Sequence, residues 1–197
     1  MTLVKDAAAA ADGTDDSATA AAAVGRNRPD GGSRGNMHDI HEYAALVARG
    51  RPSFIEVKGV TWCGDSPGSD LTMANVPWHA EVRAFCEALC GFLGGEYSLA
   101  AEHAHSCCVL IARADFKDAQ SGSWRTHIDY DRFQELVSRY YATGEIFTAL
   151  DYAAVTPAWA VYGAAEAGFD PSEARWRRKA AGGITTIEYT PSGSGCG

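Results

Sequence analysis

The chain has 197 residues, of which 46% are hydrophobic and 21% are charged, and its formal net charge is −8. This size and balance suit one folded domain or a large part of one, and they exclude a surface that is basic throughout, so a nucleic-acid partner would need a local basic patch. No apolar run reaches the length of a membrane span, the amino terminus lacks the apolar core of a signal peptide, and the six cysteines then favour a reducing compartment, so we expect a soluble cytoplasmic protein.

The first 35 residues divide into two parts. Residues 1–5 (MTLVK) form a short apolar piece, whereas residues 6–35 are rich in Ala, Asp, Gly and Ser and hold almost no large apolar side chain. Such a segment cannot bury enough apolar surface to offset the entropy lost on ordering, so we predict that it is disordered. Either an insertion or a gene model that joins the wrong pieces would explain it.

Regular structure is predicted from residue 37 onward. Residues 37–49 have the three- and four-residue apolar spacing of a helix, and residues 54–60 have the β-branched and aromatic content of a buried strand. A strand, a helix and a second strand in this order predict a βαβ unit. Two further strands are predicted at residues 97–101 and 107–112, the second of them a continuous apolar run.

A second helix is predicted between these strands. Val76 and Pro77 would begin it, Asn75 would cap it, and the Gly94-Gly95 pair would end it. Its buried stripe would consist of Val82, Phe85, Leu89, Phe92 and Leu93.

The remaining elements follow residue 113. A short strand is predicted at residues 124–128 and an amphipathic helix at 129–142, whereas residues 147–163 are apolar but irregular. The inward side chains of this third helix would be Phe133, Leu136, Val137, Tyr140 and Tyr141. A basic cluster follows, and the Gly/Ser/Thr-rich tail from Ala180 is predicted to be frayed. The cluster consists of Arg175, Arg177, Arg178 and Lys179.

Two opposite charges lie on the strand at residues 54–60. Glu56 and Lys58 have the same parity, so on a strand both side chains point to one face. On a buried strand such charges are costly unless they pair with each other or serve a ligand. Lys58 lies at the carboxyl end of the strand, which is the end where α/β folds handle ligands, so both interpretations stay open.

A second candidate group is the stretch from Glu102 to Cys107. If the stretch is extended, His103, His105 and Cys107 face one way and could offer two imidazoles and a thiolate to zinc. No fourth ligand stands at metal-site spacing, so we predict no metal site there and keep zinc as an alternative. Glu102, His103 and His105 would instead line the end of a strand near the reaction cavity, and partly exposed histidines on a loop are the alternative.

Several long segments of the chain resemble one known family. They are RPSFIEVKGVTWCGDSPGSDLTMANVPWHAEV, EHAHSCCVLIARADFK, WRTHIDYDRFQELV, FTALDYAAVTPAWAVYG and GFDPSEARWRRK. Together with residues 1–5, they resemble the carboxyl-terminal portion of the tRNA 4-demethylwyosine synthases, radical-SAM enzymes of the wybutosine pathway. The resemblance implies an α/β fold, a fragment of a radical-SAM partial (β/α) barrel at residues 36–112 with one strand remnant at 1–5. It also implies a wyosine-base-formation region at 113–179, with the insertion at 6–35 and a flexible tail at 180–197.

The resemblance also implies a reaction. The family condenses N1-methylguanosine at position 37 of phenylalanine tRNA with pyruvate, using S-adenosylmethionine and a 4Fe-4S cluster in a carbon–carbon lyase reaction. Eukaryotic members add an upstream FMN domain. The C-x3-C-x2-C cluster motif is absent from this chain, because Cys86 and Cys90 have no third cysteine at the required spacing. We therefore expect the isolated chain to lack activity, and we expect it to be a monomer.

Residue roles follow from the same resemblance. Lys58, Glu56, Glu102 and His103 would be catalytic groups, and Lys5 and His105 would bind substrate, with Lys5 and Lys58 at a shared opening. A lysine there could neutralise the pyruvate carboxylate or a tRNA phosphate. The basic cluster from Arg175 to Lys179 would contact the tRNA backbone. Two alternatives remain: a tRNA-binding module without catalysis, and a small zinc protein that uses His103, His105 and Cys107.

Overall fold

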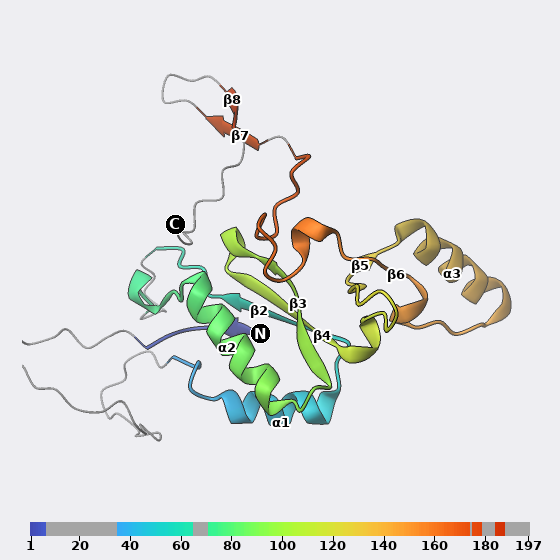
Figure 1. The fold of residues 1–197 in the computed structure, drawn as a ribbon, viewed down its shortest axis with the longest axis horizontal. Helices are drawn as coiled ribbons and strands as arrows, with labels where there is room; N and C mark the ends of the chain where they lie inside the picture. The colour runs from blue at the N-terminus through green and yellow to red at the C-terminus, as the bar shows by residue number, and fades with distance from the viewer. Residues whose placement is uncertain (7–34, 65–70, 174, 179–183, 188–197) are drawn as a thin grey trace, which may run out of the picture.

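The computed structural model describes residues 1–6, 35–64, 71–173, 175–178 and 184–187 (Figure 1). Its main feature is a four-stranded sheet with the strand order β1-β2-β4-β3. These strands are β1 (Thr2–Leu3), β2 (Phe54–Gly59), β3 (Tyr97–His103) and β4 (Cys108–Arg113). The described helices are α1 (Ile40–Gly50), α2 (His79–Phe92) and α3 (Tyr130–Thr143). The predicted mixed α/β class is confirmed, and a place within a barrel remains a prediction.

The strand directions confirm the predicted βαβ unit. In the four-stranded sheet, β1 and β2 are the one pair of hydrogen-bonded strands that run parallel. β1 pairs with β2 in parallel, and α1 lies between them in the chain. β4 then pairs antiparallel with both β2 and β3. β2 and β3 therefore run in the same direction, and their carboxyl ends meet at one edge of the sheet.

One face of the sheet is sealed by α1 and α2, which lie side by side across it (Figure 1). The buried cluster between the layers consists of Leu3, Val47, Ile55, Val57, Val82, Phe85, Cys86, Leu89, Tyr97, Cys107, Val109 and Ile111. Each large apolar side chain buried here contributes about 1.5–3 kcal/mol relative to exposure. This cluster is the main core of the chain and fixes which strand residues face the helices.

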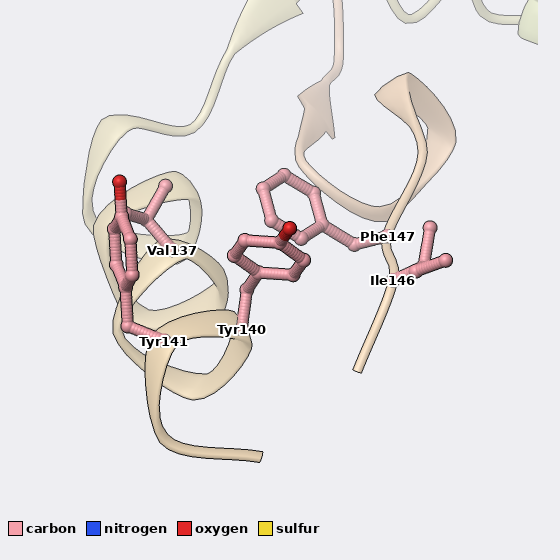
Figure 2. Close-up of a pocket in the computed structure, with 5 residues that line it drawn as sticks. All are labelled: Val137, Tyr140, Tyr141, Ile146 and Phe147. Atoms are coloured by element: carbon pink, nitrogen blue, oxygen red, sulfur yellow. The ribbon is translucent and has the colours of Figure 1, made fainter. Parts of the chain in front are cut away.

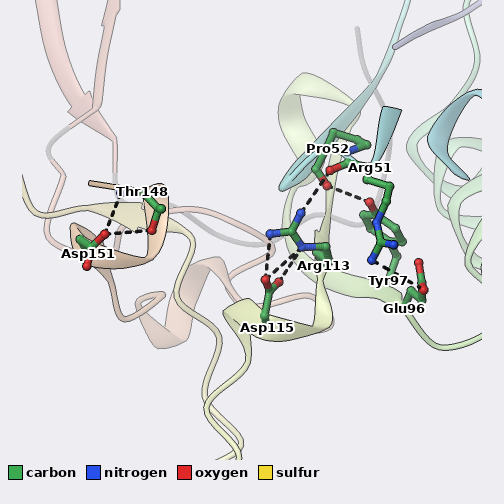
Figure 3. Close-up of polar contacts among 8 residues, drawn as sticks. All are labelled: Arg51, Pro52, Glu96, Tyr97, Arg113, Asp115, Thr148 and Asp151. Atoms are coloured by element: carbon green, nitrogen blue, oxygen red, sulfur yellow. Dashed lines mark hydrogen bonds and ion pairs between the residues drawn. The ribbon is translucent and has the colours of Figure 1, made fainter. Parts of the chain in front are cut away.

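The opposite face of the sheet is covered over only half its length. A second cluster of Ala100, Ala112, Phe116, Trp124 and Ala153 packs near the amino end of β2. Polar contacts hold the same end together (Figure 3): Arg113 donates to Asp115 at 2.8 Å, and the Tyr97 hydroxyl donates to the Pro52 carbonyl. The hydrogen bonds from Arg113 lower the pKa of Asp115. Farther along β2, no second layer formed by the described residues covers the face.

The residues on either side of the predicted insertion lie together. Gly35 N donates to Asp6 Oδ1 at 2.8 Å, and Asn36 N donates to the Val4 carbonyl at 2.8 Å. The Asn36 side chain continues this pairing, because its Oδ1 accepts from Val4 N and its Nδ2 donates to the Thr2 carbonyl. Asn36 therefore lies directly beside the end of β1, although about thirty residues separate them in the sequence. The predicted disorder of residues 7–34 lies outside the described residues.

The second helix begins later than predicted. α2 begins at His79, with Trp78 at its N-cap and Glu81 Oε2 accepting from Trp78 N at 2.6 Å. Asn75, predicted as the cap, is instead 2% exposed at the end of a short 3-10 turn, where its Nδ2 donates to the Lys5 carbonyl. The capping prediction was wrong because the sequence does not show that β1 needs a buried polar partner.

The third helix is confirmed, and its predicted inward face is covered in part: Leu136 is buried and Phe133 and Val137 are half-buried. α3 is capped by Asp129, whose Oδ1 accepts from Arg132 N, and ends at Gly144 with φ 77°. Only Leu136 is buried within it. Tyr140 and Tyr141, predicted inward, are 47% and 83% exposed. Apolar spacing shows which side of a helix requires cover and does not show whether the chain provides it.

Two carboxyl-terminal elements differ from the prediction: one strand is shorter than expected, and the tail contains a strand that was not expected. The strand expected at residues 124–128 is reduced to β5 (His127–Ile128), which pairs with β6 (Ala153–Ala154). The tail predicted to be frayed contains β8 (Ile184–Ile187), paired antiparallel with β7 (Arg175–Arg178). No helix in the described parts of the chain has both the length and the apolarity to cross a membrane.

The closeness of Asp6 and Gly35 predicts that the segment between them can be removed. Replacing residues 7–34 with two glycines should leave the free energy of unfolding unchanged or raise it by about 1 kcal/mol, because a shorter loop costs less closure entropy. Urea denaturation followed by circular dichroism measures this. A shortened chain that fails to fold would contradict the observed junction.

Asn36 should account for much of the stability of that junction. Asn36→Ala removes the bonds to Val4, Thr2 and the Tyr43 hydroxyl, so it should lower the free energy of unfolding by about 1–3 kcal/mol. Tyr43→Phe, which loses only one of these bonds, should cost less. Equal losses in the two variants would show that Asn36 does not tie β1 to the chain.

Candidate functional site

Three polar side chains form a row across the uncovered half of the sheet. Cys108 is the register partner of Lys58 on β2 and of His103 on β3. Directly opposed residues point to the same face, and neighbouring strands are about 4.8 Å apart, so Lys58 and His103 flank Cys108 with about 10 Å between their Cα atoms. The row lies at the carboxyl ends of β2 and β3.

Lys58 and Glu56 lie on the uncovered face, as their shared parity predicted. The alternation of burial along β2 leaves both exposed, whereas Ile55 and Val57 are buried under the helices. Among the described residues, no ion pair joins Glu56 to Lys58, and the predicted cost of burying two charges does not arise. Glu56 Oε1 instead accepts from Cys108 Sγ at 3.5 Å. Burial, followed by the charge of Glu56, raises the pKa of Cys108 to about 12, so its sulfur is a thiol.

His103 and His105 gather around a buried phenylalanine. The ring of Phe169 lies 4.8 Å from that of His103 and 6.0 Å from that of His105. His103 Nδ1 is 2.8 Å from Ser106 Oγ. Gly168 permits this approach, because a Cβ at that position would lie 2.1 Å from the Glu102 carbonyl. The segment that follows residue 163 therefore forms one wall beside the row.

The stretch from residue 103 to 107 is not extended, which overturns the predicted shared face. β3 ends at His103, residues 104–106 form a 3-10 turn, and Cys107 has φ 46°. The turn directs Cys107 into the core, where it is 2% exposed, away from the two histidines. No group of three potential metal ligands occurs in the described residues, so the zinc alternative gains no support.

Glu102 lies on the opposite face from His103, contrary to the prediction that both line one cavity. It pairs with Val109, which faces α2, because successive strand residues alternate between faces. Its carboxylate accepts from Gly163 N at 2.7 Å and lies 2.7 Å from His79 Nε2. With 2% of its side chain exposed, Glu102 is a buried charge held by partners.

The partners of Glu102 determine its charge state. Burial alone would raise its pKa, but the hydrogen bonds from His79 and Gly163 and the charge of Arg83 outweigh burial, so the pKa is lowered. Arg83 Nε lies 3.8 Å from the carboxylate and donates to the Tyr162 hydroxyl at 3.0 Å. Glu102 is therefore ionised, and it links β3 to α2 and to the segment after residue 160.

His79 and Arg83 were missed by the sequence analysis. Their i, i+4 spacing on a predicted helix places them on one face, and this was the available signal. The buried Nδ1 of His79 has no hydrogen-bond partner. Nothing in the sequence indicated that Glu102, 23 positions after His79, was their partner.

Lys5 does not share an opening with Lys58, so that prediction was wrong. Its Nζ donates to Glu81 Oε2 at 2.9 Å, at the first turn of α2 on the helix side of the sheet. Lys58 points to the uncovered face. The basic cluster falls mostly on β7, where Arg175, Arg177 and Arg178 are register partners of β8, while Lys179 lies outside the described residues.

The described cysteines do not fit an iron–sulfur cluster. Cys86 and Cys90 are free thiols on α2, and Cys86 is fully buried in the core. Burial raises the pKa of Cys90 to about 11 and raises that of Cys86 further. Cluster ligands are thiolates, so we assign no step to a cluster held by these residues.

Comparison with known proteins gives a consistent set of relatives. A family model described as wyosine base formation matches residues 49–113. The chain is 52% identical over 153 residues to the S-adenosyl-L-methionine-dependent tRNA 4-demethylwyosine synthase of Oryza sativa subsp. japonica, covering 78% of this chain and 23% of that protein. The synthases of Danio rerio and Homo sapiens are 53% and 52% identical over 146 residues, covering 73% of this chain and 20% of each protein.

These matches also show how much of each relative the chain covers. It spans about a fifth of the length of the relatives it matches. The wyosine base formation match lies on β2, α2, β3 and β4, before the segment 113–179 for which that name was predicted. The row of Lys58, Cys108 and His103 therefore falls inside the matched segment.

The lowered pKa of Glu102 predicts a pH-dependent contribution to stability. A carboxylate with a lowered folded pKa stabilises the fold above its ordinary value of 4.5 and loses that contribution as the pH falls below it. Glu102→Gln should therefore lower the free energy of unfolding by about 1–3 kcal/mol near neutral pH, and the difference from the parent should shrink in acid. Urea titrations at about pH 7 and about pH 3 measure it.

A matched control separates this network from general acid effects. Glu56→Gln removes an exposed carboxylate from the neighbouring strand and should change stability by less than about 0.5 kcal/mol at either pH. A Glu102 variant whose deficit stays the same in acid would contradict the assignment of a buried, ionised carboxylate.

Proposed function

We propose that this chain forms part of a tRNA-modifying synthase of the wybutosine pathway. Its similarity to the S-adenosyl-L-methionine-dependent tRNA 4-demethylwyosine synthases, which extends over about three quarters of the chain, supports this proposal. The reaction is the condensation of N1-methylguanosine at position 37 of phenylalanine tRNA with pyruvate. Since the chain spans a fifth of its relatives, it contributes one portion of the synthase and requires the remainder for turnover.

The row of Lys58, Cys108 and His103 is the observation that carries this proposal. It lies at the carboxyl ends of β2 and β3, on the half of the sheet that no second layer covers, and inside the wyosine base formation match. A lysine ammonium at such an edge is an anion site, and the pyruvate carboxylate is an anion of matching size. The imidazole of His103 could donate or accept a proton, and the ring of His105 lies 6.5 Å from it.

The proposed role of each polar group depends on the face of the sheet to which its side chain points. Lys58 would bind the substrate carboxylate, Glu56 would hold the Cys108 thiol beside it, and His103 would exchange a proton with the substrate. Glu102 is too deeply buried to touch a substrate, so it acts as a positioning residue that fixes β3 against α2. Lys5, paired with Glu81, keeps the start of α2 in place and does not bind substrate.

The cofactors of the reaction would be bound by the rest of the synthase. The names of the relatives state a dependence on S-adenosyl-L-methionine, which would supply the radical chemistry that the family resemblance implies. The described residues of this chain do not fit a 4Fe-4S cluster, and an FMN domain would also lie outside it. This chain would supply the edge of the sheet that contacts the substrate.

Contact with tRNA is assigned to the basic cluster at Arg175, Arg177, Arg178 and Lys179. Arginines on the strand pair β7–β8 would neutralise backbone phosphates, which need positive charge and carry no sequence requirement. The same ribbon favours the second candidate, a tRNA-holding module without catalysis. We propose a monomeric cytoplasmic protein for either function.

A chimera tests the proposal. The segment of the rice synthase that matches this chain would be replaced by residues 1–197, and 4-demethylwyosine would be measured in phenylalanine tRNA by mass spectrometry. The chimera should form the modified base, and Lys58→Ala should reduce its formation at least tenfold, because the substrate anion loses its counter-charge. Lys117→Ala, an exposed lysine stacked on Trp124 away from the row, should leave it unchanged.

Two outcomes would contradict the proposal. A folded chimera that binds tRNA and makes no product would favour the tRNA-holding module. Equal product from the Lys58 and Lys117 variants would show that the row does not handle substrate.

A further inference from the structure

Exposed apolar side chains concentrate in one part of the molecule. Among the described residues, eleven large hydrophobic side chains are exposed, and seven of them lie between residues 128 and 155. They are Ile128, Tyr130, Tyr140, Tyr141, Ile146, Leu150 and Val155. This segment contains α3, which stands at one end of the molecule, apart from the main sheet (Figure 1). Solubility alone does not explain such a concentration, which usually marks a contact surface.

The centre of this surface is a pocket between α3 and the chain that follows it. Figure 2 shows Tyr140 facing Phe147, with Val137 and Tyr141 on the helix side and Ile146 on the other. The pocket has a volume of about 290 Å³, and its rim residues Tyr141 and Ile146 are 83% and 84% exposed. It is wide enough for one or two apolar side chains.

α3 has the features of a helix whose apolar face packs against another layer. Asp129 and Gly144 cap its ends, and its apolar residues keep a regular stripe. Yet Leu136 is its only buried residue. Short helices in water depend on tertiary packing for most of their stability, so a capped helix with one buried side chain indicates a missing layer.

The charges around the pocket restrict what can cover it. Residues 128–155 contain five carboxylates and two arginines. Both arginines are already paired, since Arg132 and Arg139 each donate to Glu135, at 2.6 and 2.8 Å. The rim is therefore acidic, and it repels the phosphates of a nucleic acid. A second copy placed symmetrically would bring two acidic rims together, which is also unfavourable.

We infer that the pocket surface, defined as Val137, Tyr140, Tyr141, Ile146 and Phe147, docks the part of the synthase polypeptide that lies outside this chain. The contacting segment would present an apolar side chain flanked by lysine or arginine. More than three quarters of each relative lies outside the matched region, so a large unmatched partner surface exists in the same protein. The inference requires the kinship with the synthases and does not require the proposed roles of Lys58 or His103.

Binding between separate polypeptides tests the docking surface. The rice synthase without its matched segment would be titrated with the full 197-residue chain by isothermal calorimetry. Tyr141→Asp and Ile146→Asp should each weaken binding at least tenfold, because an added charge in the pocket is desolvated beside existing carboxylates. Ala142→Asp is the matched control. It adds the same charge on the next residue of the last helical turn, outside the pocket lining, and should bind as the parent does.

Hydrogen exchange gives a second measurement if the truncated rice protein does not fold. In the full-length chimera, amides of residues 137–147 should exchange at least tenfold more slowly than in the isolated chain. Equal binding by the Tyr141 and Ala142 variants, or unchanged exchange in the chimera, would overturn the inference. Self-association or tRNA retention that Tyr141→Asp abolishes would also overturn it, in favour of a second copy or a nucleic acid.

Discussion

The one-sided cover of the main sheet determines the rest of the structure. Because α1 and α2 seal one face, alternate residues of β2 and β4 must be apolar, and Ile55, Val57, Val109 and Ile111 meet that requirement. Their neighbours in the chain then point to the other face, where the described residues form a second layer near the amino end of β2. Lys58, Cys108 and His103 come together because of this alternation, without any direct bond among the three.

The same alternation divides the polar residues into two groups with different tasks. Glu102, next to His103 in the chain, is turned toward α2, where His79 and Gly163 hold its carboxylate. A buried carboxylate with three polar partners resists movement of the strand end, since breaking such a group leaves an uncompensated charge. The exposed row can therefore change its contacts with a substrate while the buried group keeps the strand ends in register.

Much of the fold could be predicted from residue patterns, and the failures share one cause. The βαβ unit, the third helix and the parity of Glu56 and Lys58 follow from local periodicity, and all three were predicted correctly. The faces of Glu102 and Cys107 depend on where β3 stops and turns, which rests on long-range packing against residues 163–169. The tyrosines of α3 were assigned inward because an apolar stripe gives no information on its cover. His79 was missed because its partner is distant in sequence.

The register of the row is the most direct test of this account. Lys58→Cys would place two sulfurs on directly opposed residues of β2 and β4, within the Cα separation of about 4.4–6.8 Å that a disulfide requires. Under mild oxidation, peptide mapping should recover a bond between the new cysteine and Cys108. A Glu102→Cys variant, whose side chain points to the helices, should form no bond with Cys108. Pairing of Cys108 with position 102 and not with position 58 would contradict the arrangement of the sheet and the site built on it.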